Sequence, residues 1–452
     1  MDIKKFLESE YSYENFKKFI FDKFYGFEEN DIEYEEPDTN IEQKHILKYK
    51  FMGSCQLDDK KEIGFFEVIT TEKTDIENNR VSLGNILKNK ASNELLDSAI
   101  AVFYNPNNPS VWRLSFIKFS YDENDKKEVS NLKRFTYVLG KNIPIKTAYN
   151  QLKNLKYPSL IELEEAFSVD KVTKEFFINY KDLYFKLVKD LTVVNQKNIT
   201  QQEEKILEDN KQVSFYIKKL LGRIVFLYFV QKKGWLNSDR KFLSNLFYNF
   251  TKENPNINFY DEILEDLFFN ALNTKRDNDK INLGGNEYEI PYLNGGLFEE
   301  DEYDKTDLTI TNENLKQVLE LFDSYNFTVI EDTPHDSEIA IDPEMLGRVF
   351  EDLLEDRKEK GAFYTPREIV HYMCQQSIIN YLLNFYGEDS LEDIKSLVIE
   401  DKTDTKFIRN NAKDIKNYLE NIKVLDPAIG SGAFPMGMLH EIVSILSNLD
   451  KT

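Results

Sequence analysis

The stretch VLDPAIGSGAF at residues 424–434 constrains the fold of this chain most strongly. The apolar run at 422–426 predicts a strand that ends at Asp426, and the residues after the turn have the apolar spacing of a helix. Gly430 and Gly432 allow positive φ angles and let a bound molecule approach the backbone. In open α/β sheets, ligands bind at the carboxyl ends of parallel strands, and a helix start suits a carboxylate or a phosphate. The pattern therefore predicts a parallel α/β domain with a ligand site at this turn.

The glycine turn also has a plainer interpretation. Many strand–helix turns carry Gly-x-Gly for packing alone, so the two glycines do not require a ligand. The turn lacks the lysine of a phosphate-cradling Gly-Lys-Ser/Thr loop, which argues against a nucleoside triphosphate. The sequence thus indicates either a packing turn or a ligand other than ATP or GTP.

Length and composition indicate a globular protein of more than one domain. The chain has 452 residues, of which 41% are hydrophobic, and no apolar run approaches the ~18 residues of a membrane span. Its charged amino terminus lacks the apolar core of a signal peptide, and Cys55 and Cys374 have no metal-type spacing. We therefore expect a cytoplasmic protein that keeps its cysteines reduced and does not enter a membrane.

The balance of charge is strongly acidic, with a formal net charge of −22. Such a charge argues against non-specific binding of nucleic acid by the chain as a whole, but it leaves room for a local basic groove. The most basic neighbourhood comprises KKLLGR at 218–223 and QKKGW at 231–235. Its lysines and arginine are either solvated ends of helices or contacts to phosphate groups, and the sequence leaves both interpretations open.

The pattern of apolar residues divides the chain into three predicted domains, 1–150, 151–335 and 336–452. The first combines a helical start with several strands and one crossing helix, which is typical of a small α/β domain. The second has the apolar spacing of helices, and the third adds helical stretches before the glycine turn. The strands of the first domain are expected at 45–57, 61–72, 98–105 and 110–120. Trp112 and Trp235 are both expected to lie in the core.

Two stretches of this sequence resemble motifs of adenine-specific DNA methyltransferases. VLDPAIGSGAF resembles their S-adenosylmethionine loop, and GAFYTPREIV at 361–370 is similar to the upstream motif that closes over the methionine part of the cofactor. IPYLNGGLF, LLGRIVFLYFVQKKGW and YNFTVIEDTPHDSEIAIDPEMLGRVFEDLL are similar to the connector of large single-chain restriction–modification enzymes of the type IIG class. KRFTYVLGKNIPIKTAYNQL and SVWRLSFIKF are similar to the end of their amino-terminal domain. The resemblance covers nearly the whole chain and implies a Rossmann-like methyltransferase domain that begins within 336–452.

The resemblance also implies two groups of cofactor-binding residues. The glycine turn contributes those that would line S-adenosylmethionine: Asp426, Ala428, Gly430 and Gly432. The upstream stretch contributes those that would cover it: Phe363, Tyr364, Thr365 and Pro366. For the second group, a helix entry with a buried aromatic side chain is the alternative interpretation.

Adenine methylation needs more than a cofactor site, because the target base must leave the helix stack and present its amino group to the methyl group. The family uses an Asn/Asp-Pro-Pro-aromatic motif downstream of the cofactor loop for this step, and the sequence contains no such motif. The resemblance therefore implies the amino-terminal part of an enzyme that acts on double-stranded DNA, completed by a carboxyl-terminal partner chain or a specificity domain. By itself the chain is expected not to methylate DNA, and its last ~100 residues are expected to be marginally stable.

Three other functions are consistent with the sequence. The first is that of a catalytically inactive remnant that binds DNA or another subunit. The second is that of one half of a split methyltransferase, whose second chain carries the missing motif. The third is a methyltransferase-fold protein that acts on protein or RNA. The connector argues against this third function, because it resembles that of DNA enzymes.

In the type IIG class, the first domain is a nuclease of the PD-(D/E)xK type, in which two carboxylates bind Mg²⁺ and a lysine helps to activate water. The candidate carboxylates here are Asp58 or Asp59 and Glu67 in QLDDKKEIGFFEVITTEK. Asp58 stands nine residues before Glu67, a spacing that suits a shared metal ion. Glu14, on the first predicted helix, is a candidate third ligand.

The lysine of this nuclease motif is missing from its expected position. Ile69 stands two residues after Glu67, where the motif requires a lysine. Lys73 or Arg80 is a candidate substitute, although neither has the expected place on the strand. A nuclease that cuts with Mg²⁺ and a degenerate nuclease fold kept for packing or DNA contact therefore both stay open as interpretations.

Overall fold

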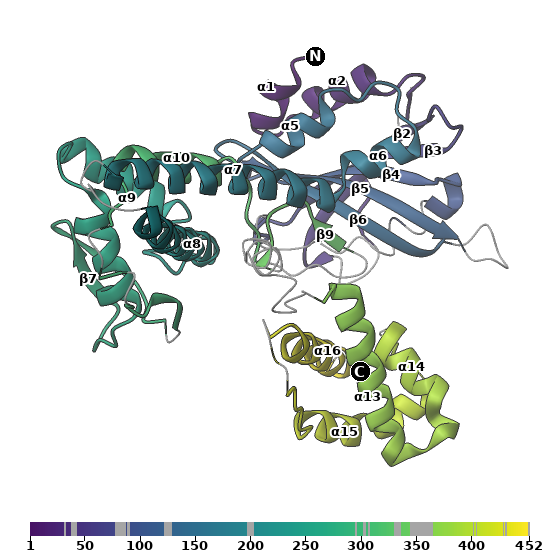
Figure 1. Cartoon of the computed structure of the whole chain (residues 1–452). Helices are drawn as coiled ribbons and strands as arrows, with labels where there is room; N and C mark the ends of the chain where they lie inside the picture. The colour runs from purple at the N-terminus through teal and green to yellow at the C-terminus, as the bar shows by residue number, and fades with distance from the viewer. Residues whose placement is uncertain are drawn as a thin grey trace. The chain divides into compact units, whose positions relative to one another are not determined.

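The computed structural model divides the chain into two compact units, Met1–Leu346 and Gly347–Thr452 (Figure 1). Each unit contains a hydrophobic core of its own. The structure describes residues 1–30, 33–37, 43–76, 87, 91–121, 129–196, 203–293, 296–301, 304–305, 308–329, 336–343, 365–400, 402–403, 405–427, 429 and 432–450.

The first unit is built around a seven-stranded sheet. Its strands lie in the order β1 (Glu28–Glu29), β2 (Ile46–Gln56), β3 (Glu62–Thr70), β4 (Ser98–Asn105), β5 (Asn108–Tyr121), β6 (Val129–Gly140) and β9 (Asp336–Glu338). β3 and β4 pair in parallel, as do β6 and β9, whereas the other neighbours pair antiparallel. The mixed α/β character predicted for this part of the chain is confirmed.

β3 lies inside the sheet and is buried on both faces. Its sequence, EIGFFEVIT, is almost continuously apolar, as expected for a strand that is covered on two sides. Phe66 and Val68 belong to the hydrophobic core on one face. Glu67 points to the other face, where the chain between α1 (Ile3–Glu8) and α2 (Tyr13–Lys23) lies over the sheet (Figure 1).

β9 also belongs to this sheet, although it follows the whole helical region in the sequence. Arg134 on β6 pairs with Asp336, and Arg113 on β5 pairs with Glu338, whose Oε2 lies 3.3 Å from the guanidinium. Arg113 and Glu338 are buried, so the pair is shielded from water and salt. Residues 336–338, which begin the third predicted domain, therefore form part of the sheet of the first unit.

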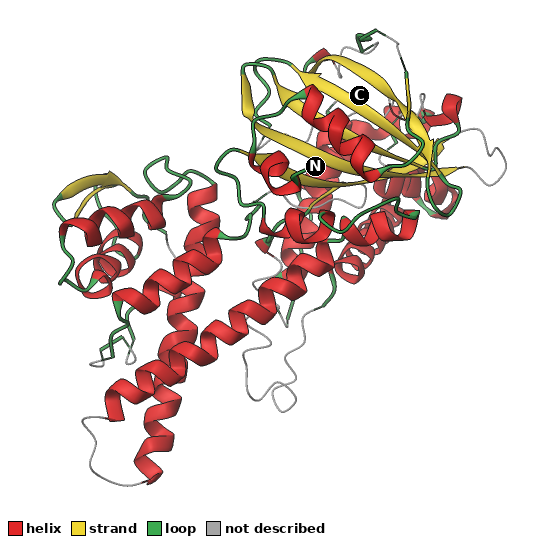
Figure 2. Ribbon diagram, turned by 90° about the horizontal axis from the view of Figure 1, so that it is seen from above, coloured by secondary structure: helices red, strands yellow, loops and turns green. Residues whose placement is uncertain are grey.

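Helices dominate residues 146–323, as the apolar spacing predicts. They are α5 (Lys146–Leu152), α6 (Leu160–Ala166), α7 (Val169–Gln196), α8 (Glu203–Lys232), α9 (Phe242–Glu253), the π-helical η1 (Tyr260–Leu264) and η2 (Asp266–Leu272), the short η3 (Gly296–Phe298) and α10 (Asn312–Asp323). The two long helices α7 and α8 pack against each other and lead away from the sheet (Figure 2). β7 (Lys280–Leu283) and β8 (Asn286–Glu289) form a hairpin, in which Gly284 and Gly285 supply the positive φ angles of a two-residue turn.

The two tryptophans differ in their surroundings. Trp112 on β5 is fully buried, as predicted, and its indole N–H donates to the carbonyl of Ser9 at 3.0 Å. The prediction is wrong for Trp235, which is 53% exposed. Gly234, with a positive φ, turns the chain after α8, and Leu236 takes the buried position instead.

The described part of the second unit is helical. It comprises α13 (Arg367–Tyr386), η4 (Glu388–Ser390), α14 (Leu391–Glu400), α15 (Lys406–Glu420) and α16 (Ala433–Leu449). The strand predicted at 422–426 is wrong, because the structure assigns no strand there. A strand needs a neighbour for its hydrogen bonds, and the described residues of this unit contain no other strand.

Candidate functional site

The glycine turn leads from the extended segment at 422–427 into α16. Gly432 stands immediately before α16 with a φ of +84°, a left-handed conformation that glycine adopts without strain. A Cβ at this position would meet no atom within 4 Å, so the backbone conformation, and not a lack of space, favours glycine. Gly432 thus has the positive φ that the sequence predicts, whereas Ala428 and Gly430 lie outside the described residues.

Asp426 lies at the end of the extended segment, beside a cavity of about 490 Å³. The cavity is lined mainly by apolar groups of α13, α16 and the segment 422–427: Met373, Cys374, Tyr381, Val424, Leu425, Pro427, Phe434, Pro435 and Met438. Asp426 thus brings a half-buried carboxylate to an otherwise mostly apolar hollow at the start of α16.

α13 begins within the upstream motif and α16 begins within the glycine turn, and these two helices pack against each other. A Cβ on Gly437 would lie 2.6 Å from Cγ1 of Val370, so this glycine lets the two helices approach closely. His371 also pairs with the buried Glu441 across the same contact. The start of α13 therefore lies against the first turns of α16.

The upstream motif is described only in part. Thr365 is half-buried and Pro366 is exposed, and α13 begins directly after them. The carbonyl of Pro366 accepts from the amides of Ile369 and Val370 at 3.0 and 3.1 Å, so it closes the first turn. Phe363 and Tyr364 lie outside the described residues.

Glu67 on β3 is fully buried, and both of its carboxylate oxygens accept hydrogen bonds. The hydroxyl of Tyr11 donates to Oε1 at 2.6 Å, and the hydroxyl of Tyr34 donates to Oε2. Burial and the negative charge of Glu67 raise the pKa of both hydroxyls, and the same causes raise the pKa of Tyr104 to about 12. Glu67 is thus enclosed by neutral phenols.

The predicted partners of Glu67 lie elsewhere. Asp58 and Asp59 belong to the turn between β2 and β3, where Asp59 accepts from the amide of Leu160 at 3.1 Å. Glu67 stands five residues beyond Glu62, the first residue of β3, or about 16 Å along a strand that rises about 3.3 Å per residue. The register of the hairpin therefore does not bring Asp58 and Glu67 together at one metal ion.

The other predicted metal and cation groups are also apart from Glu67. Glu14 is exposed on α2 and lines a surface hollow of about 690 Å³ between α1 and α2. Lys73 lies in the exposed turn after β3, and Arg80 lies outside the described residues. Within the described ranges, no group of three or more His, Cys, Asp or Glu side chains is placed to hold a metal ion. The residues described here therefore do not fit a Mg²⁺ site.

Two further lysines, which are not part of the nuclease motif, lie on the strand next to Glu67. Lys50 on β2 is directly opposite Glu67, and Lys48 is directly opposite Ile69. Residues that face each other across an antiparallel pair lie on the same face of the sheet. Nζ of Lys48 lies 4.3 Å from the ring centre of Tyr34, within the range of a cation–π contact. The alternation in LKYKF was the available signal, but only the strand register shows what these lysines face.

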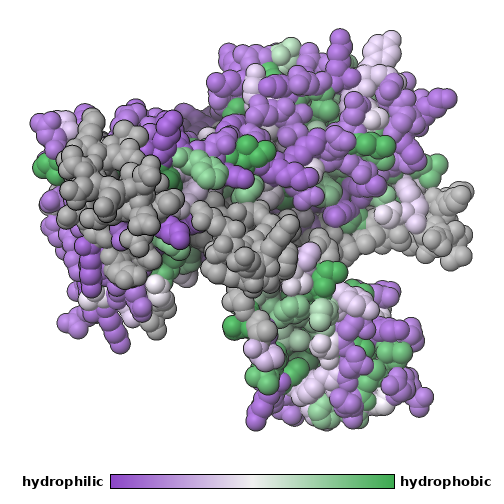
Figure 3. All heavy atoms as spheres, viewed as in Figure 1, coloured by the Kyte–Doolittle hydropathy of each residue, from purple (hydrophilic) through white to green (hydrophobic). Residues whose placement is uncertain are grey.

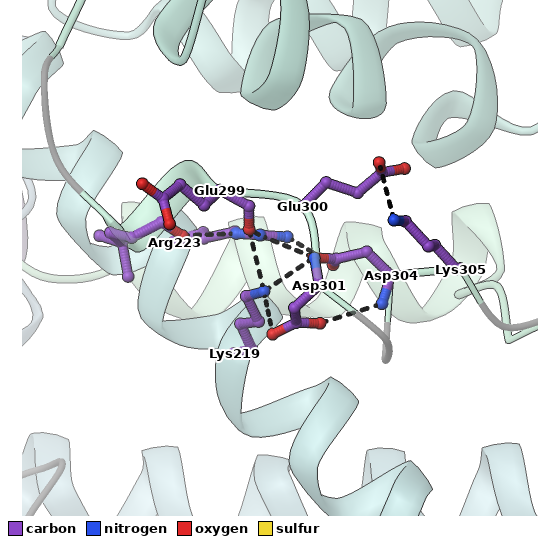
Figure 4. Close-up of polar contacts among 8 residues, drawn as sticks. Lys219, Arg223, Glu299, Glu300, Asp301, Asp304 and Lys305 are labelled. Atoms are coloured by element: carbon purple, nitrogen blue, oxygen red, sulfur yellow. Dashed lines mark hydrogen bonds and ion pairs between the residues drawn. The ribbon is translucent and has the colours of Figure 1, made fainter.

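Two cations of the basic neighbourhood of α8, Lys219 and Arg223, are neutralised within the chain (Figure 4). Arg223 is 1% exposed and makes two hydrogen bonds to the carboxylate of Asp304, at 2.7 and 2.9 Å. Lys219 bonds to the same carboxylate at 2.7 Å and also pairs with Asp301. Burial alone would raise the pKa of Asp304, but the hydrogen bonds from Arg223 and Lys219 lower it below its ordinary value. These two cations therefore hold an acidic loop and are not available to DNA phosphates.

Residues 296–298, the described part of the NGGLF loop, pack on the same helix. The side chain of Phe298 is buried, and its ring centre lies 5.7 Å from that of Phe268. Arg223 donates to the carbonyls of Leu297 and Glu299, both at 2.9 Å. The described part of this loop thus has a packing role.

Two comparisons with known proteins found a match. A family described as a domain of unknown function, DUF7814, matches residues 171–345. A Methanocaldococcus jannaschii protein named "Putative type II restriction enzyme and methyltransferase" is 28% identical over 383 residues, which cover 74% of this chain and 32% of the relative. The chain thus spans about a third of the length of this curated relative. No solved structure matches the chain. In the part of the chain that the structure describes, no helix is long and apolar enough to cross a membrane.

Proposed function

We propose that this chain is the amino-terminal part of a type IIG-like restriction–modification enzyme that methylates adenine in double-stranded DNA with S-adenosylmethionine. The observation that carries the proposal is the 28% identity to a protein named for both activities, over 74% of the chain. The glycine turn supplies the place for the cofactor, and the cytoplasm is the compartment in which such an enzyme meets DNA.

The residues of the turn fit a cofactor with a positively charged amino acid part. Asp426 offers a carboxylate at the mouth of the hollow, and Gly432 leaves the approach to the backbone open. The amides of Ala433 and Phe434 in the first turn of α16 suit the carboxylate of the methionine part, since they have no intrahelical acceptor, whereas Pro435 has no N–H. We assign Ala428 and Gly430 to the same lining, and Phe363, Tyr364, Thr365 and Pro366 to the cover. S-adenosylmethionine would supply the methyl group.

Calorimetry with S-adenosylmethionine tests the cofactor site. We expect the unaltered chain to bind, and Asp426→Ala to lose binding. Asp414→Ala, which removes an exposed carboxylate from α15 in the same unit, is the matched control and should bind normally. Equal binding by Asp426→Ala and the unaltered chain would contradict the assignment of Asp426.

For the amino-terminal sheet, we propose a degenerate nuclease-like fold that contacts DNA or a partner subunit without cutting. The supporting observation is the enclosure of Glu67, whose two oxygens are both occupied by tyrosine hydroxyls. A plasmid-nicking assay with Mg²⁺ tests this proposal. Cleavage that is lost in Glu67→Gln would contradict it.

Residues 1–452 do not contain the Asn/Asp-Pro-Pro-aromatic motif that binds the target base in adenine methyltransferases. The chain spans 32% of the length of its relative, which is named for both restriction and methyltransferase activities. We therefore propose a carboxyl-terminal partner chain or specificity domain that supplies the base-binding motif. An inactive remnant that binds DNA or a subunit is the alternative, and the absence of cofactor binding in the calorimetric test would favour it.

A further inference from the structure

The long helix α7 presents a stripe of lysines and apolar side chains to solvent. The stripe consists of five exposed residues: Lys174, Ile178, Lys181, Phe185 and Lys189. Their spacing of three and four residues places them on one face of the helix. Figure 3 shows apolar side chains, in green, at the surface among hydrophilic ones, in purple, where α7 crosses the view of Figure 1. This face is therefore mixed, whereas the solvent face of a surface helix is normally hydrophilic throughout.

The neighbouring helix α8 extends this surface. Nζ of Lys218 lies 5.7 Å from the ring centre of Tyr184 on α7 and 5.8 Å from that of Phe215 on α8. The ring centres of Tyr184 and Phe185 are 5.1 Å apart, and Nζ of Lys181 lies 5.9 Å from the ring centre of Phe185. Ammonium groups and rings therefore alternate across the two helices, within the range of cation–π contacts. We call these five residues the ladder.

The rings of the ladder are fixed by packing between the helices. Tyr184 is buried, and its hydroxyl shares a hydrogen bond with the hydroxyl of Ser214 on α8. The outer rings, those of Phe185 and Phe215, are 55% and 50% exposed. Exposed rings on two helices that pack against each other lose little conformational entropy when a ligand covers them. The ladder is thus a preformed surface for flat groups.

The two lysines of the ladder differ from the other cations of the basic stretch on α8. Lys219 and Arg223 are paired with the acidic loop, whereas Lys181 and Lys218 make no ion pair with a carboxylate of the described residues. One exposed carboxylate, that of Asp182, lies at the flank of the stripe. The surface is therefore locally positive on a chain with a net charge of −22, which favours a polyanionic partner at this place.

The alternation of cations and rings indicates which polyanion fits. An unpaired nucleic-acid strand offers phosphates for lysines and base faces for aromatic rings. A duplex keeps its base faces inside the stack, so the exposed rings of Phe185 and Phe215 would find no base to stack on. The core of a protein–protein interface is depleted in lysine, so a protein partner fits the interleaved lysines less well.

We infer that the ladder binds an unpaired DNA strand, with phosphates on Lys181 and Lys218 and bases stacked on Phe185 and Phe215. That the strand is DNA and not RNA rests on the proposed function. The binding surface itself does not, because α7 and α8 belong to the first compact unit and the candidate cofactor site belongs to the second.

Fluorescence anisotropy with a labelled oligothymidylate of about 16 nucleotides and the whole 452-residue chain tests the role of the rings. We expect Phe185→Leu to weaken binding about fivefold or more, because it keeps an apolar side chain and removes the stacking surface. Phe185→Trp should bind at least as tightly as the unaltered chain. Hydrogen exchange of α7 should be the same in all three proteins, since this side chain is exposed.

The salt dependence of the same binding tests the role of the lysines. Lys181→Ala and Lys218→Ala should each reduce the slope of log K against log salt concentration by about 0.7, the value for one phosphate contact on a single strand. Lys241→Ala, which removes an exposed lysine just before α9, is the matched control and should leave the slope unchanged.

Four outcomes would overturn the inference. The first is that the oligothymidylate does not bind, and the second is that it binds equally well to Phe185→Leu. The third is tighter binding of a duplex of the same length or of an oligouridylate, since duplex DNA or RNA would then be the occupant. The fourth is displacement of the oligothymidylate by polyglutamate at equal charge concentration, because the surface would then bind acidic polymers of any kind.

Calorimetry with S-adenosylmethionine keeps this inference apart from the proposed function. Phe185→Leu should bind the cofactor as the unaltered chain does. A chain that binds the oligothymidylate through Phe185 and does not bind the cofactor would contradict the proposed function and support the ladder as a DNA-binding surface.

Discussion

Glu67 and Asp426 are two carboxylates that follow similar apolar runs and end in opposite environments. Glu67 lies in β3, between the paired strands β2 and β4, and is fully buried. Asp426 ends a segment that has no strand neighbour among the described residues, next to a side chain that is 88% exposed. The apolar runs EIGFFEVIT and IKVLD differ little in local preference, so the neighbours decide which one becomes a strand.

The comparison has a functional meaning. The amino-terminal sheet is complete, and its candidate catalytic carboxylate is closed off by Tyr11 and Tyr34. The carboxyl-terminal turn is open and keeps its carboxylate beside a hollow. Paired strands thus surround the site that we expect to be inactive. The site that we expect to bind a cofactor follows a segment that has no strand neighbour among the described residues.

The largest expected effect on the free energy of unfolding comes from removing a core side chain next to Glu67. Phe66→Ala should lower the free energy of unfolding by about 3–5 kcal/mol, because it deletes a buried aromatic ring from β3. The matched variant Leu425→Ala should change this free energy by no more than about 0.5 kcal/mol, because that side chain is exposed. Urea unfolding followed by hydrogen exchange of β3 and α13 checks both values. A large loss from Leu425→Ala would show that the segment 422–426 is already packed.

A smaller effect is expected from the buried carboxylate itself. Glu67→Leu should cost about 1–3 kcal/mol, because it leaves the buried hydroxyl of Tyr11 without its acceptor. The double variant with Tyr11→Phe should recover part of this loss, since it removes the unsatisfied hydroxyl. Urea unfolding of the two single variants and the double variant measures the coupling. If the losses of the two single variants simply add up in the double variant, the hydrogen bond between Tyr11 and Glu67 is not the cause of the loss.

Alkaline pH should lower the free energy of unfolding of the unit that contains Glu67. Burial and the charge of Glu67 raise the pKa of Tyr104 to about 12, so the folded state keeps this hydroxyl neutral when the unfolded state ionises it. The stability that it contributes is complete below about pH 10 and is lost as the pH rises from there towards 12. Urea midpoints between pH 8 and pH 11 check this, and Tyr104→Phe should reduce the slope. An unchanged slope in that variant would assign the pH dependence to other tyrosines.

The smallest effect is expected from a divalent metal. Mg²⁺ at millimolar concentration should neither stabilise the first unit nor support cleavage, because the described residues provide no group of carboxylates around Glu67. Thermal unfolding with Mg²⁺ and with EDTA measures this. A metal-dependent rise in the midpoint that Glu67→Gln removes would contradict the enclosure.

The sequence predicted the parts of the fold that depend on local pattern. The strands expected around Glu67, the helices of the connector and the positive φ of Gly432 follow from apolar spacing and from glycine chemistry. The sequence could not reveal that Lys50 faces Glu67, because this depends on the register between two strands. It also could not place β9, whose pairing with β6 and ion pairs to Arg113 and Arg134 join residues far apart in the chain.

For the candidate cofactor site, the sequence predicted the turn but not its support. The strand expected at 422–426 requires neighbours that no local pattern supplies, and the structure shows the segment without them. The close crossing of α13 and α16 at Gly437 was likewise not evident, since a glycine inside a helix reveals its purpose only when the second helix is seen.

The measurement that tests the account most directly is hydrogen exchange of the whole chain with and without S-adenosylmethionine. We expect β3 to be strongly protected in both states, and residues 422–434 to exchange rapidly until the cofactor slows them. Asp426→Ala should remove this slowing and leave β3 unchanged. Strong protection of 422–434 without the cofactor, or no response of this stretch to the cofactor, would contradict the account.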